Sequence, residues 1–263
     1  IKDINNPIEI NKIIKGKIEA RNLSFTYENN KNETLKNLSF SIYPGELVAV
    51  VGPVGCGKTT LARAIGRIIE IPRGQLFLDD LDVFELKLED LRKNIAIVPQ
   101  EGYLFTTTIA ENLKYGDPFA SESKVKECAS QANLIDDIKG FPEGYKTLVG
   151  ERGITLSGGQ RQRTALGRAL IMRAPLIVLD DALASVDNKT AAGILTSIRQ
   201  ENKSTVLLIS HQLSAAAACD RILVLDKGEL VQEGSHLELI KRKGLYKALW
   251  EREKATEKIE KVS

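Results

Sequence analysis

The sequence predicts an α/β fold whose core is a mixed, largely parallel sheet. Three short apolar runs, at residues 47–51, 176–179 and 205–209, contain almost no polar residue. Such runs are typical of buried strands, and of parallel strands that helices cover on both faces. The first run passes through a glycine-rich turn into a helical pattern at residues 60–69, which indicates a strand–turn–helix unit.

Other patterns on either side of this core predict antiparallel strands. Residues 17–25 and 38–42 alternate apolar and polar positions around a turn-rich segment at 28–33. Towards the C-terminus, residues 222–225 have buried-strand character, and residues 226–229, Asp-Lys-Gly-Glu, are typical of a hairpin turn. We therefore expect an N-terminal antiparallel β subdomain beside the parallel core.

The middle of the chain, from about residue 100 to residue 164, has a helical pattern with few strand signals. We expect an inserted α-helical subdomain there. Its short helices are predicted at residues 108–115, 123–132 and 134–139.

The glycine-rich turn fits the phosphate-loop pattern G-x-x-x-x-G-K-[ST] at residues 52–59, Gly-Pro-Val-Gly-Cys-Gly-Lys-Thr. Its glycines let backbone N–H groups converge on phosphate oxygens, and the start of the next helix adds partial positive charge there. We expect Lys58 to reach the β- and γ-phosphates of a nucleotide and Thr59 to offer its hydroxyl to Mg²⁺. An ordinary glycine-rich turn is the plainer alternative, but the strand-to-helix setting favours a nucleotide site.

Two aspartates, Asp180 and Asp181, follow the apolar run at residues 176–179. The carboxyl end of a central parallel strand is where open α/β sheets bind their ligands. We expect Asp180 to hold Mg²⁺, directly or through water, because this ion prefers hard oxygen ligands. Without the phosphate loop, two acids capping a strand end would be the preferred interpretation.

A second glycine-containing helix start lies at residues 156–160, Leu-Ser-Gly-Gly-Gln, ahead of an amphipathic stretch. Ser157 is typical of an N-cap, and Gly158 and Gly159 leave backbone donors exposed. Because a helix N-terminus carries partial positive charge, this helix start is also suited to an anion. One chain therefore contains two anion-binding helix starts.

These motifs, in this order and followed by Ser210-His211, resemble the nucleotide-binding domain of ATP-binding-cassette (ABC) transporters. The resemblance covers residues 17–250, and the pentapeptide at 156–160 beside a phosphate loop is highly specific. It implies an ABC ATPase fold with a RecA-like core, the antiparallel β subdomain and the inserted helical subdomain. It also implies that residues 156–160, the signature segment, grip ATP held by a second, facing domain in a head-to-tail dimer.

The resemblance also assigns roles to single residues. Tyr27 matches the aromatic residue that stacks on adenine, Gln100 the glutamine near Mg²⁺ and the attacking water, and His211 the histidine that contacts the γ-phosphate. Asp181 stands where the water-polarising carboxylate is kept. Catalysis is thus assigned to Gln100, Asp181 and His211, and Mg²⁺ to Thr59, Gln100 and Asp180. The residues expected to contact ATP are Tyr27, Gly52, Gly55, Cys56, Gly57, Lys58, Thr59, Thr60, Ser157, Gly158, Gly159 and Gln160.

Asp181 departs from the family pattern, which usually has glutamate at this position. The shorter side chain withdraws the carboxylate by about 1.5 Å, and a general base must lie within about 2.6–3.2 Å of its water. Because placement errors near 1 Å can cost about a hundredfold, we expect slow hydrolysis at this chain's own site. This combination resembles one half of a heterodimeric exporter whose partner is a different chain with the consensus glutamate. A homodimer in which aspartate is a working base stays open.

Further segments resemble exporters. Residues 149–153 resemble the x-loop that touches coupling helices of the membrane domain, and residues 244–250 look like the end of an exporter half-transporter. Because the chain opens at Ile1 without methionine, we expect a fragment from the cytoplasmic face of the cell membrane. Residues 1–16 would be its linker from an upstream membrane domain, and residues 251–263 a charged, solvated tail.

Composition argues against several function classes. The formal net charge of +2, with 27% charged and 5% aromatic residues, indicates neither nucleic-acid binding nor a base-stacking platform. Three scattered cysteines point to a reducing compartment. A soluble ABC ATPase of DNA repair or translation would need a coiled-coil insertion or a second cassette, and the sequence shows neither. A nucleotide-sensing module that binds ATP without turnover stays open.

Overall fold

The computed structural model describes residues 1–28, 30–150 and 156–260. The strands of the larger sheet are Leu47–Val51 (β3), Ile95–Val98 (β6), Leu176–Asp180 (β7), Thr205–Ile209 (β8), Arg221–Asp226 (β9) and Glu229–Gly234 (β10). Their order is β10-β9-β3-β8-β7-β6. Neighbouring strands are parallel except β10, which pairs antiparallel with β9. The three apolar runs are therefore parallel strands, which confirms that prediction.

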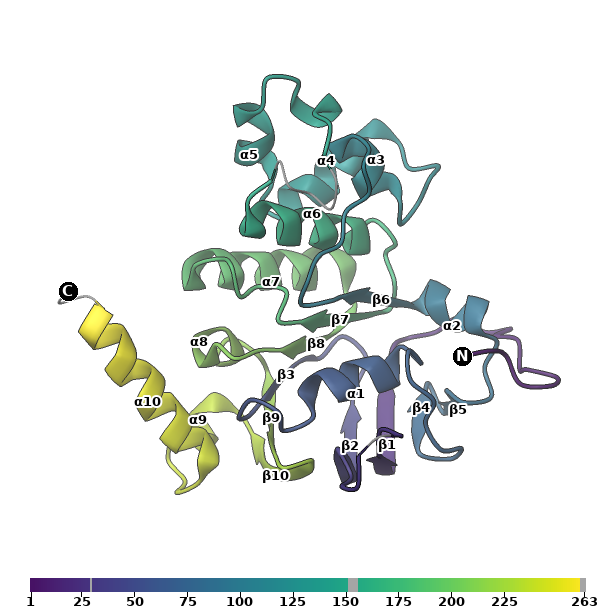
Figure 1. The fold of residues 1–263 in the computed structure, drawn as a ribbon, viewed down its shortest axis with the longest axis vertical. Coiled ribbons are helices and arrows are strands. Elements are labelled where there is room, and N and C mark those ends of the chain that lie inside the picture. The colour runs from purple at the N-terminus through teal and green to yellow at the C-terminus, as the bar shows by residue number, and fades with distance from the viewer. Residues whose placement is uncertain (29, 151–155, 261–263) are drawn as a thin grey trace.

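The helices lie on both sides of this sheet (Figure 1). Beyond helix α6, the helices α3, α4 and α5 and a 3₁₀ turn form the inserted helical subdomain. The bounds of the helices are Lys58–Ile65 (α1), Leu88–Asn94 (α2), Ile109–Lys114 (α3), Glu122–Gln131 (α4), Ile135–Gly140 (α5), Gly144–Lys146 (η1), Gly158–Leu170 (α6), Asn188–Asn202 (α7), Leu213–Ala216 (α8), His236–Leu239 (α9) and Leu245–Glu260 (α10).

Both faces of the parallel strands are buried, which explains their uninterrupted apolar sequence. In β3, Leu47, Ala49 and Val51 belong to one hydrophobic core, and Val48 and Val50 to another. The first core includes α6 and α7, and the second includes α1 and the antiparallel sheet. Burying one such valine or leucine side chain contributes about 1.5–3 kcal/mol. The sheet thus holds α1 on one side and α6 on the other.

The second sheet is the predicted antiparallel subdomain. Its strands are Ile18–Phe25 (β1), Leu35–Ile42 (β2), Leu76–Leu78 (β4) and Leu81–Asp82 (β5), in the order β2-β1-β4-β5. Strand β2 starts three residues before the predicted 38, because register shifts along β1 break the alternating pattern. Asn22 and Asn37, with φ of 50 and 47, accompany these irregularities. The predicted hairpin turn between β9 and β10 is confirmed by positive φ at Lys227 and Gly228.

The predicted bounds of the first helix, residues 60–69, also differ from the structure. Helix α1 begins at Lys58 rather than residue 60 and ends at Ile65, because the left-handed backbone of Arg67 (φ 46) stops it. Residues 251–260, part of the predicted charged tail, continue helix α10, and Glu253 accepts backbone hydrogen bonds from α8. Residues 251, 252, 255 and 256 are exposed, so this part of the predicted tail is helical and largely in contact with solvent.

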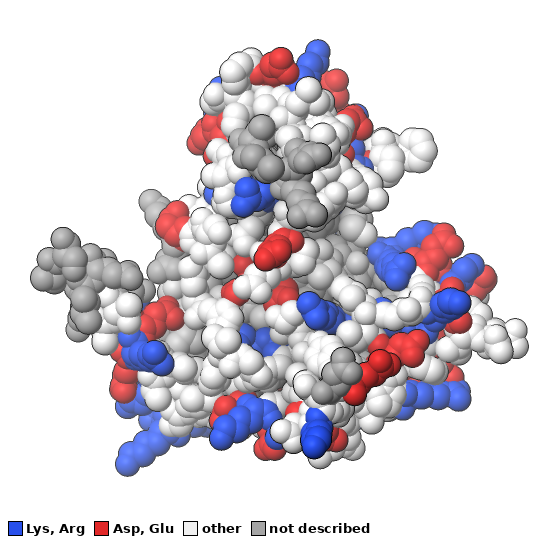
Figure 2. All heavy atoms as spheres, viewed as in Figure 1, with Lys and Arg blue, Asp and Glu red and all other residues white. Residues whose placement is uncertain are grey.

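Residues 1–16 run along the β subdomain. The backbone N–H of Ile8 donates to Glu85 at 2.8 Å, and the carbonyl of Ile8 accepts from Lys87 at 2.9 Å. This segment is therefore docked, and its use as a linker stays a prediction. On the face shown in Figure 2, basic and acidic side chains are interspersed, in keeping with the small net charge. Within the described ranges, none of the helices has the length and apolarity that crossing a membrane requires.

Candidate active site

The phosphate loop joins the end of β3 to helix α1. Three of its glycines have a left-handed backbone, with φ of 151 at Gly52, 80 at Gly55 and 105 at Gly57. A Cβ at Gly52 would lie 2.0 Å from the Leu225 carbonyl oxygen, and one at Gly57 would lie 2.8 Å from that of Thr34. Glycine is therefore required at Gly52 and Gly57, because no other residue combines this backbone with so close an approach.

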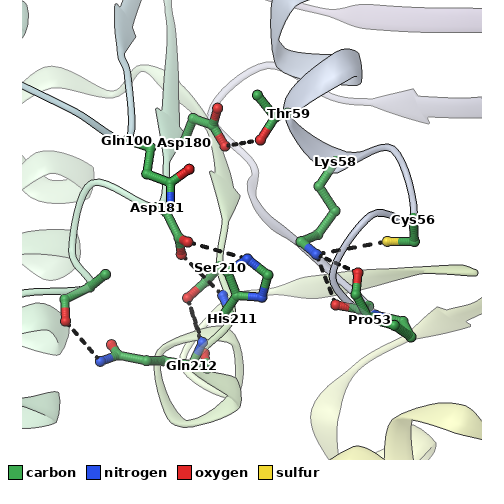
Figure 3. A network of polar contacts seen from close by, with 12 residues as sticks. Pro53, Cys56, Lys58, Thr59, Gln100, Asp180, Asp181, Ser210, His211 and Gln212 are labelled. Atoms are coloured by element: carbon green, nitrogen blue, oxygen red, sulfur yellow. Dashed lines mark hydrogen bonds and ion pairs between the residues drawn. The ribbon is translucent and has the colours of Figure 1, made fainter. Parts of the chain in front are cut away.

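Lys58 starts helix α1 and folds back over the loop (Figure 3). Its Nζ donates hydrogen bonds to the carbonyl oxygens of Gly52 at 2.8 Å and Pro53 at 3.0 Å. The residue is only 4% exposed, so its ammonium group is held at the loop and away from solvent. A phosphate oxygen would give this ammonium a charged acceptor, and such charge-assisted bonds are stronger than bonds to neutral carbonyls.

Cys56 contributes to the loop mainly through its backbone. Its N–H donates to the Pro53 carbonyl at 3.3 Å, and its carbonyl accepts from the Gly228 N–H at 3.1 Å. The thiol belongs to the hydrophobic core and lies 3.8 Å from Lys58 Nζ. Burial raises the pKa of this thiol. The Cys56 side chain is therefore a core group, and contact with a ligand would come from the backbone.

Thr59 and Asp180 bring two oxygen groups together beside the loop. Thr59 Oγ1 donates to Asp180 Oδ1 at 3.2 Å, which joins the first turn of α1 to the end of β7. Both residues line a cavity of about 400 Å³ that Gln100 also borders. Burial raises the pKa of the Asp180 carboxyl, and the Thr59 hydrogen bond offsets part of this shift.

This oxygen set fits Mg²⁺, which prefers hard oxygen ligands and binds to proteins through one or two carboxylates plus phosphate oxygens. The residues predicted for the ion, Thr59, Gln100 and Asp180, do line one cavity. Over the described ranges, no group of three or more His, Cys, Asp or Glu side chains is arranged to hold a metal by itself. Phosphate and water oxygens would therefore have to complete the coordination.

Asp181 is a buried carboxylate in direct contact with His211 (Figure 3). Its Oδ1 accepts the His211 backbone N–H at 3.2 Å, and its Oδ2 lies 3.3 Å from His211 Nε2. The Asp181 side chain is 7% exposed and the His211 ring 44% exposed, so the pair extends from the core to solvent. The Asp181 backbone is left-handed, with φ of 52, a conformation that aspartate tolerates better than most residues. The two side chains can together accept a proton from a group on the solvent side.

Gln162 on α6 ties three loops together and was missed by the sequence analysis. Its Nε2 donates to the Gln100 carbonyl at 3.1 Å and makes a longer contact of 3.4 Å with the Asp181 carbonyl. Its Oε1 accepts the Ser185 N–H at 3.2 Å. The helical pattern of the sequence could have indicated Gln162. It shares the buried face of α6 with Leu166, one turn later, and a polar residue is unexpected on that face.

The signature segment has the predicted N-cap. Ser157 Oγ accepts the Gln160 N–H at 3.2 Å, and Gln160 Oε1 accepts the Ser157 N–H at 2.9 Å, which completes a capping box. The Gln160 amide also donates to Asp137 on α5 at 3.1 Å. Asp137 pairs with Arg163 at 2.7 Å as well. No sequence pattern indicated Asp137, which holds the signature segment through Gln160 and Arg163.

The signature segment begins helix α6, and the phosphate loop leads into helix α1. Helices α6 and α1 pack against opposite faces of the larger sheet (Figure 1). Ser157 and Gly158 are exposed. A Cβ at Gly158 would meet its nearest neighbouring atoms only at 3.9 Å, so this surface is open to an approaching molecule.

Tyr27 lies beside the start of α1. Its Oη is 3.3 Å from Thr60 Oγ1, and its ring stands edge-on to Phe25, with ring centroids 4.8 Å apart. The aromatic residue predicted to stack on adenine is therefore next to the phosphate loop, and the stacking stays a prediction. Of the predicted x-loop, residues 151–153 lie outside the described residues.

A phosphate loop, strand-end aspartates and an inserted helical subdomain define a phosphate-loop nucleotide-binding domain. The family model described as "ABC transporter" matches residues 35–184 of the chain. The chain therefore belongs to this family. It is 38% identical, with a TM-score of 0.90, to the solved structure of a bacterial Atm1-family ABC exporter with ATP bound, over 95% of this chain and 44% of that one. This likeness confirms the predicted ABC ATPase fold.

Similar curated proteins include transporters with different names. The chain is 41% identical over 239 residues to the ATP-dependent lipid A-core flippase of Photobacterium profundum, which covers 90% of this chain and 41% of that protein. It is 37% identical over 249 residues to the multidrug resistance-like ATP-binding protein MdlA of Buchnera aphidicola, covering 94% and 43%. It is 40% identical over 238 residues to the mitochondrial iron-sulfur clusters transporter ATM1 of Chaetomium globosum, covering 89% and 39%. The chain thus spans about two-fifths of the length of these relatives.

Proposed function

We propose that the chain is the ATP-hydrolysing motor domain of an ABC exporter at the cytoplasmic face of the cell membrane. The observation that carries the proposal is the Thr59–Asp180 hydrogen bond beside the loop that Lys58 closes. The named relatives differ in cargo although their identity to this chain is similar, from 37% to 41%. We infer that this domain supplies the energy of transport and does not select the cargo.

The side chains of the site divide the work. Lys58 exchanges its two loop carbonyls for β- and γ-phosphate oxygens, and Tyr27 stacks on the adenine. Thr59 and Asp180 would hold Mg²⁺, and the bound ion would offset the negative charge of the transferred phosphoryl group. Asp181 and His211 polarise the attacking water, because their contact places a buried carboxylate and a half-exposed imidazole side by side.

The signature segment completes the active site of a second nucleotide-binding domain. Its exposed capping box and the N-terminus of α6 offer backbone donors and partial positive charge to a phosphate. Because α6 and α1 pack on opposite faces of the sheet, this phosphate belongs to a nucleotide of the facing domain. Two ATP molecules are then enclosed between two domains arranged head to tail.

The two sites of this dimer are unequal in our proposal. Asp181 has about 1.5 Å less reach than the glutamate usual in the family, and its carboxylate is buried against His211. Hydrolysis at this chain's own site is therefore slow. The partner is a different chain with glutamate at that position, and its site, completed by Ser157 and Gly158 of this chain, carries most of the turnover.

The membrane domain docks its coupling helices beside the Gln100 loop in this proposal. A groove of about 570 Å³ lies there, lined by residues that include Gln100, Tyr103, Arg161 and Gln162. The Tyr103 side chain at its edge is exposed. Because Gln162 bonds the backbones of Gln100 and Asp181, a helix that moves in this groove also acts on the catalytic loops.

Two substitutions test this assignment in the reconstituted transporter that contains the domain. Gly158→Asp adds a carboxylate where the partner's γ-phosphate would lie and meets no close neighbour in this chain. Lys58→Ala removes the phosphate contact at this chain's own site. We expect phosphate release to fall further in Gly158→Asp than in Lys58→Ala. Gly140→Asp is the matched control, because Gly140 is also exposed and has no atom near its Cβ position.

The same assay separates the alternatives. A larger loss in Lys58→Ala than in Gly158→Asp would show that this chain's own site dominates, which favours aspartate as a working base. ATP binding without phosphate release, even with the partner present, would instead favour a nucleotide-sensing module. Rapid turnover by the chain paired with its own copy would rule out the unequal dimer.

A further inference from the structure

The segment that carries His211 is bonded to the C-terminal helix α10. Helix α8 begins two residues after His211, and its N-cap residue Gln212 makes no capping hydrogen bond with its side chain. Instead, Glu253 on α10 accepts the Leu213 N–H at 2.8 Å and the Ser214 N–H at 3.1 Å, one with each carboxylate oxygen. A charged side chain 40 residues further along the chain thus satisfies two backbone donors at the start of α8.

The start of the same segment is held by the loop that carries Asp181 and Ala184. Asp181 accepts the His211 backbone N–H at 3.2 Å, and the side chain of Gln212 makes a longer contact of 3.4 Å with the Ala184 carbonyl. The segment from His211 to Ser214 is therefore bonded to Asp181 at its start and to Glu253 at its end. A displacement of α8 would change the 3.3 Å contact between His211 Nε2 and the Asp181 carboxylate.

Helix α10 is anchored in the core, so that it can hold Glu253 in a fixed position beside α8. Tyr246 is fully buried, and its Oη lies 2.7 Å from His236 Nδ1. Trp250 packs on the main core and lies against His236, with ring centroids 4.5 Å apart. Glu253 follows Trp250 by less than one helical turn, so its carboxylate is held close to where α8 begins.

We propose that Glu253 is a positioning residue for His211. By capping α8, it holds the His211 ring against Asp181, so that the docking of α10 sets the rate of ATP hydrolysis at this site. The effect on the rate of hydrolysis rests on the proposed function. The effect on the position of His211 follows from the hydrogen bonds alone. Glu253 touches neither nucleotide nor water in this proposal and acts only through α8.

The position of His211 can be measured directly, because the chain has two histidines, His211 and His236. In the ring-labelled 263-residue chain, NMR gives two sets of imidazole signals, which a His211→Gln variant assigns. Glu253→Gln keeps the size of the side chain and removes its charge and one acceptor oxygen. We expect it to shift the His211 signals and leave the His236 signals in place.

The matched control is Glu251→Gln. Glu251 is an exposed carboxylate on the same helix, 3.9 Å from Lys247, and we expect its replacement to leave both histidines unchanged. If Glu253→Gln does not fold, Glu253→Asp provides a second variant, which withdraws the carboxylate by about 1.5 Å and keeps its charge. It should shift the His211 signals in the same direction.

In the reconstituted transporter, Glu253→Gln should lower single-turnover hydrolysis at this chain's site by about tenfold, since angstrom-scale misplacement can cost up to a hundredfold. ATP affinity should stay within about twofold, because Glu253 lies outside the phosphate loop. Unchanged His211 signals in every folded Glu253 variant would overturn the proposal. A shifted His211 signal in a domain that never hydrolyses ATP would support the positioning contact and refute the proposed function instead.

Discussion

Replacing Asp181 with glutamate should speed hydrolysis at this chain's own site. The added methylene extends the carboxylate by about 1.5 Å, which is the deficit that we infer for aspartate. Because a placement error near 1 Å can cost about a hundredfold, we expect the single-turnover rate to rise by about tenfold to a hundredfold. This corresponds to about 1.4–2.7 kcal/mol of additional transition-state stabilisation.

The same substitution should slightly destabilise the folded domain. The backbone at Asp181 has φ of 52, and a left-handed conformation costs about 1–2 kcal/mol for ordinary residues and less for aspartate. The hydrogen bond from the His211 N–H to the Asp181 carboxylate must also readjust to the longer side chain. We therefore expect Asp181→Glu to lower the melting temperature and to raise the hydrolysis rate. A faster reaction in a less stable domain could not be explained by general stabilisation of the fold.

A rapid-quench measurement of ATP cleavage would test the prediction in the transporter. Gly158→Asp in this chain inactivates the partner's site, so that the remaining ATP cleavage takes place at this chain's own site. Asp180→Glu is the control, because the same extension at the Thr59-bonded carboxylate should slow the reaction. A rate for Asp181→Glu no higher than that of the unmodified chain would refute the inference that reach limits this site.

Two further predictions concern stability. In metal-free buffer, Asp180→Asn should raise the free energy of unfolding at neutral pH, because burial raises the pKa of Asp180 in the folded state. The gain should shrink as the pH falls through that pKa and the native carboxyl becomes neutral, which denaturant titrations at several pH values would show. Asp137→Asn should cost about 1–3 kcal/mol, because Asp137 accepts hydrogen bonds from Gln160 and from the half-buried Arg163. It should also slow turnover at the partner's site, and a variant as stable and as active as the original would contradict the prediction.

The sequence predicted the parts of the fold that depend on local patterns. Buried parallel strands can be identified as apolar runs because both of their faces are covered. The phosphate loop can be identified by its glycines, which the backbone conformation and the close neighbours require. Strands β4 and β5, three and two residues long, are too short to leave such a pattern, and β4 pairs with distant β1 while β5 pairs with β4.

The residue types that we propose for phosphate and Mg²⁺, and the aspartate in place of glutamate, could be identified from the sequence alone, since each depends on a few consecutive residues. Only the tertiary structure decided how these groups are held. Gln162 links the Gln100 and Asp181 loops, Asp137 supports the signature segment, and Glu253 caps the helix after His211. These partners are 19 to 62 residues apart in sequence, and they meet because helices and strands pack to bury their apolar faces, which no local pattern specifies.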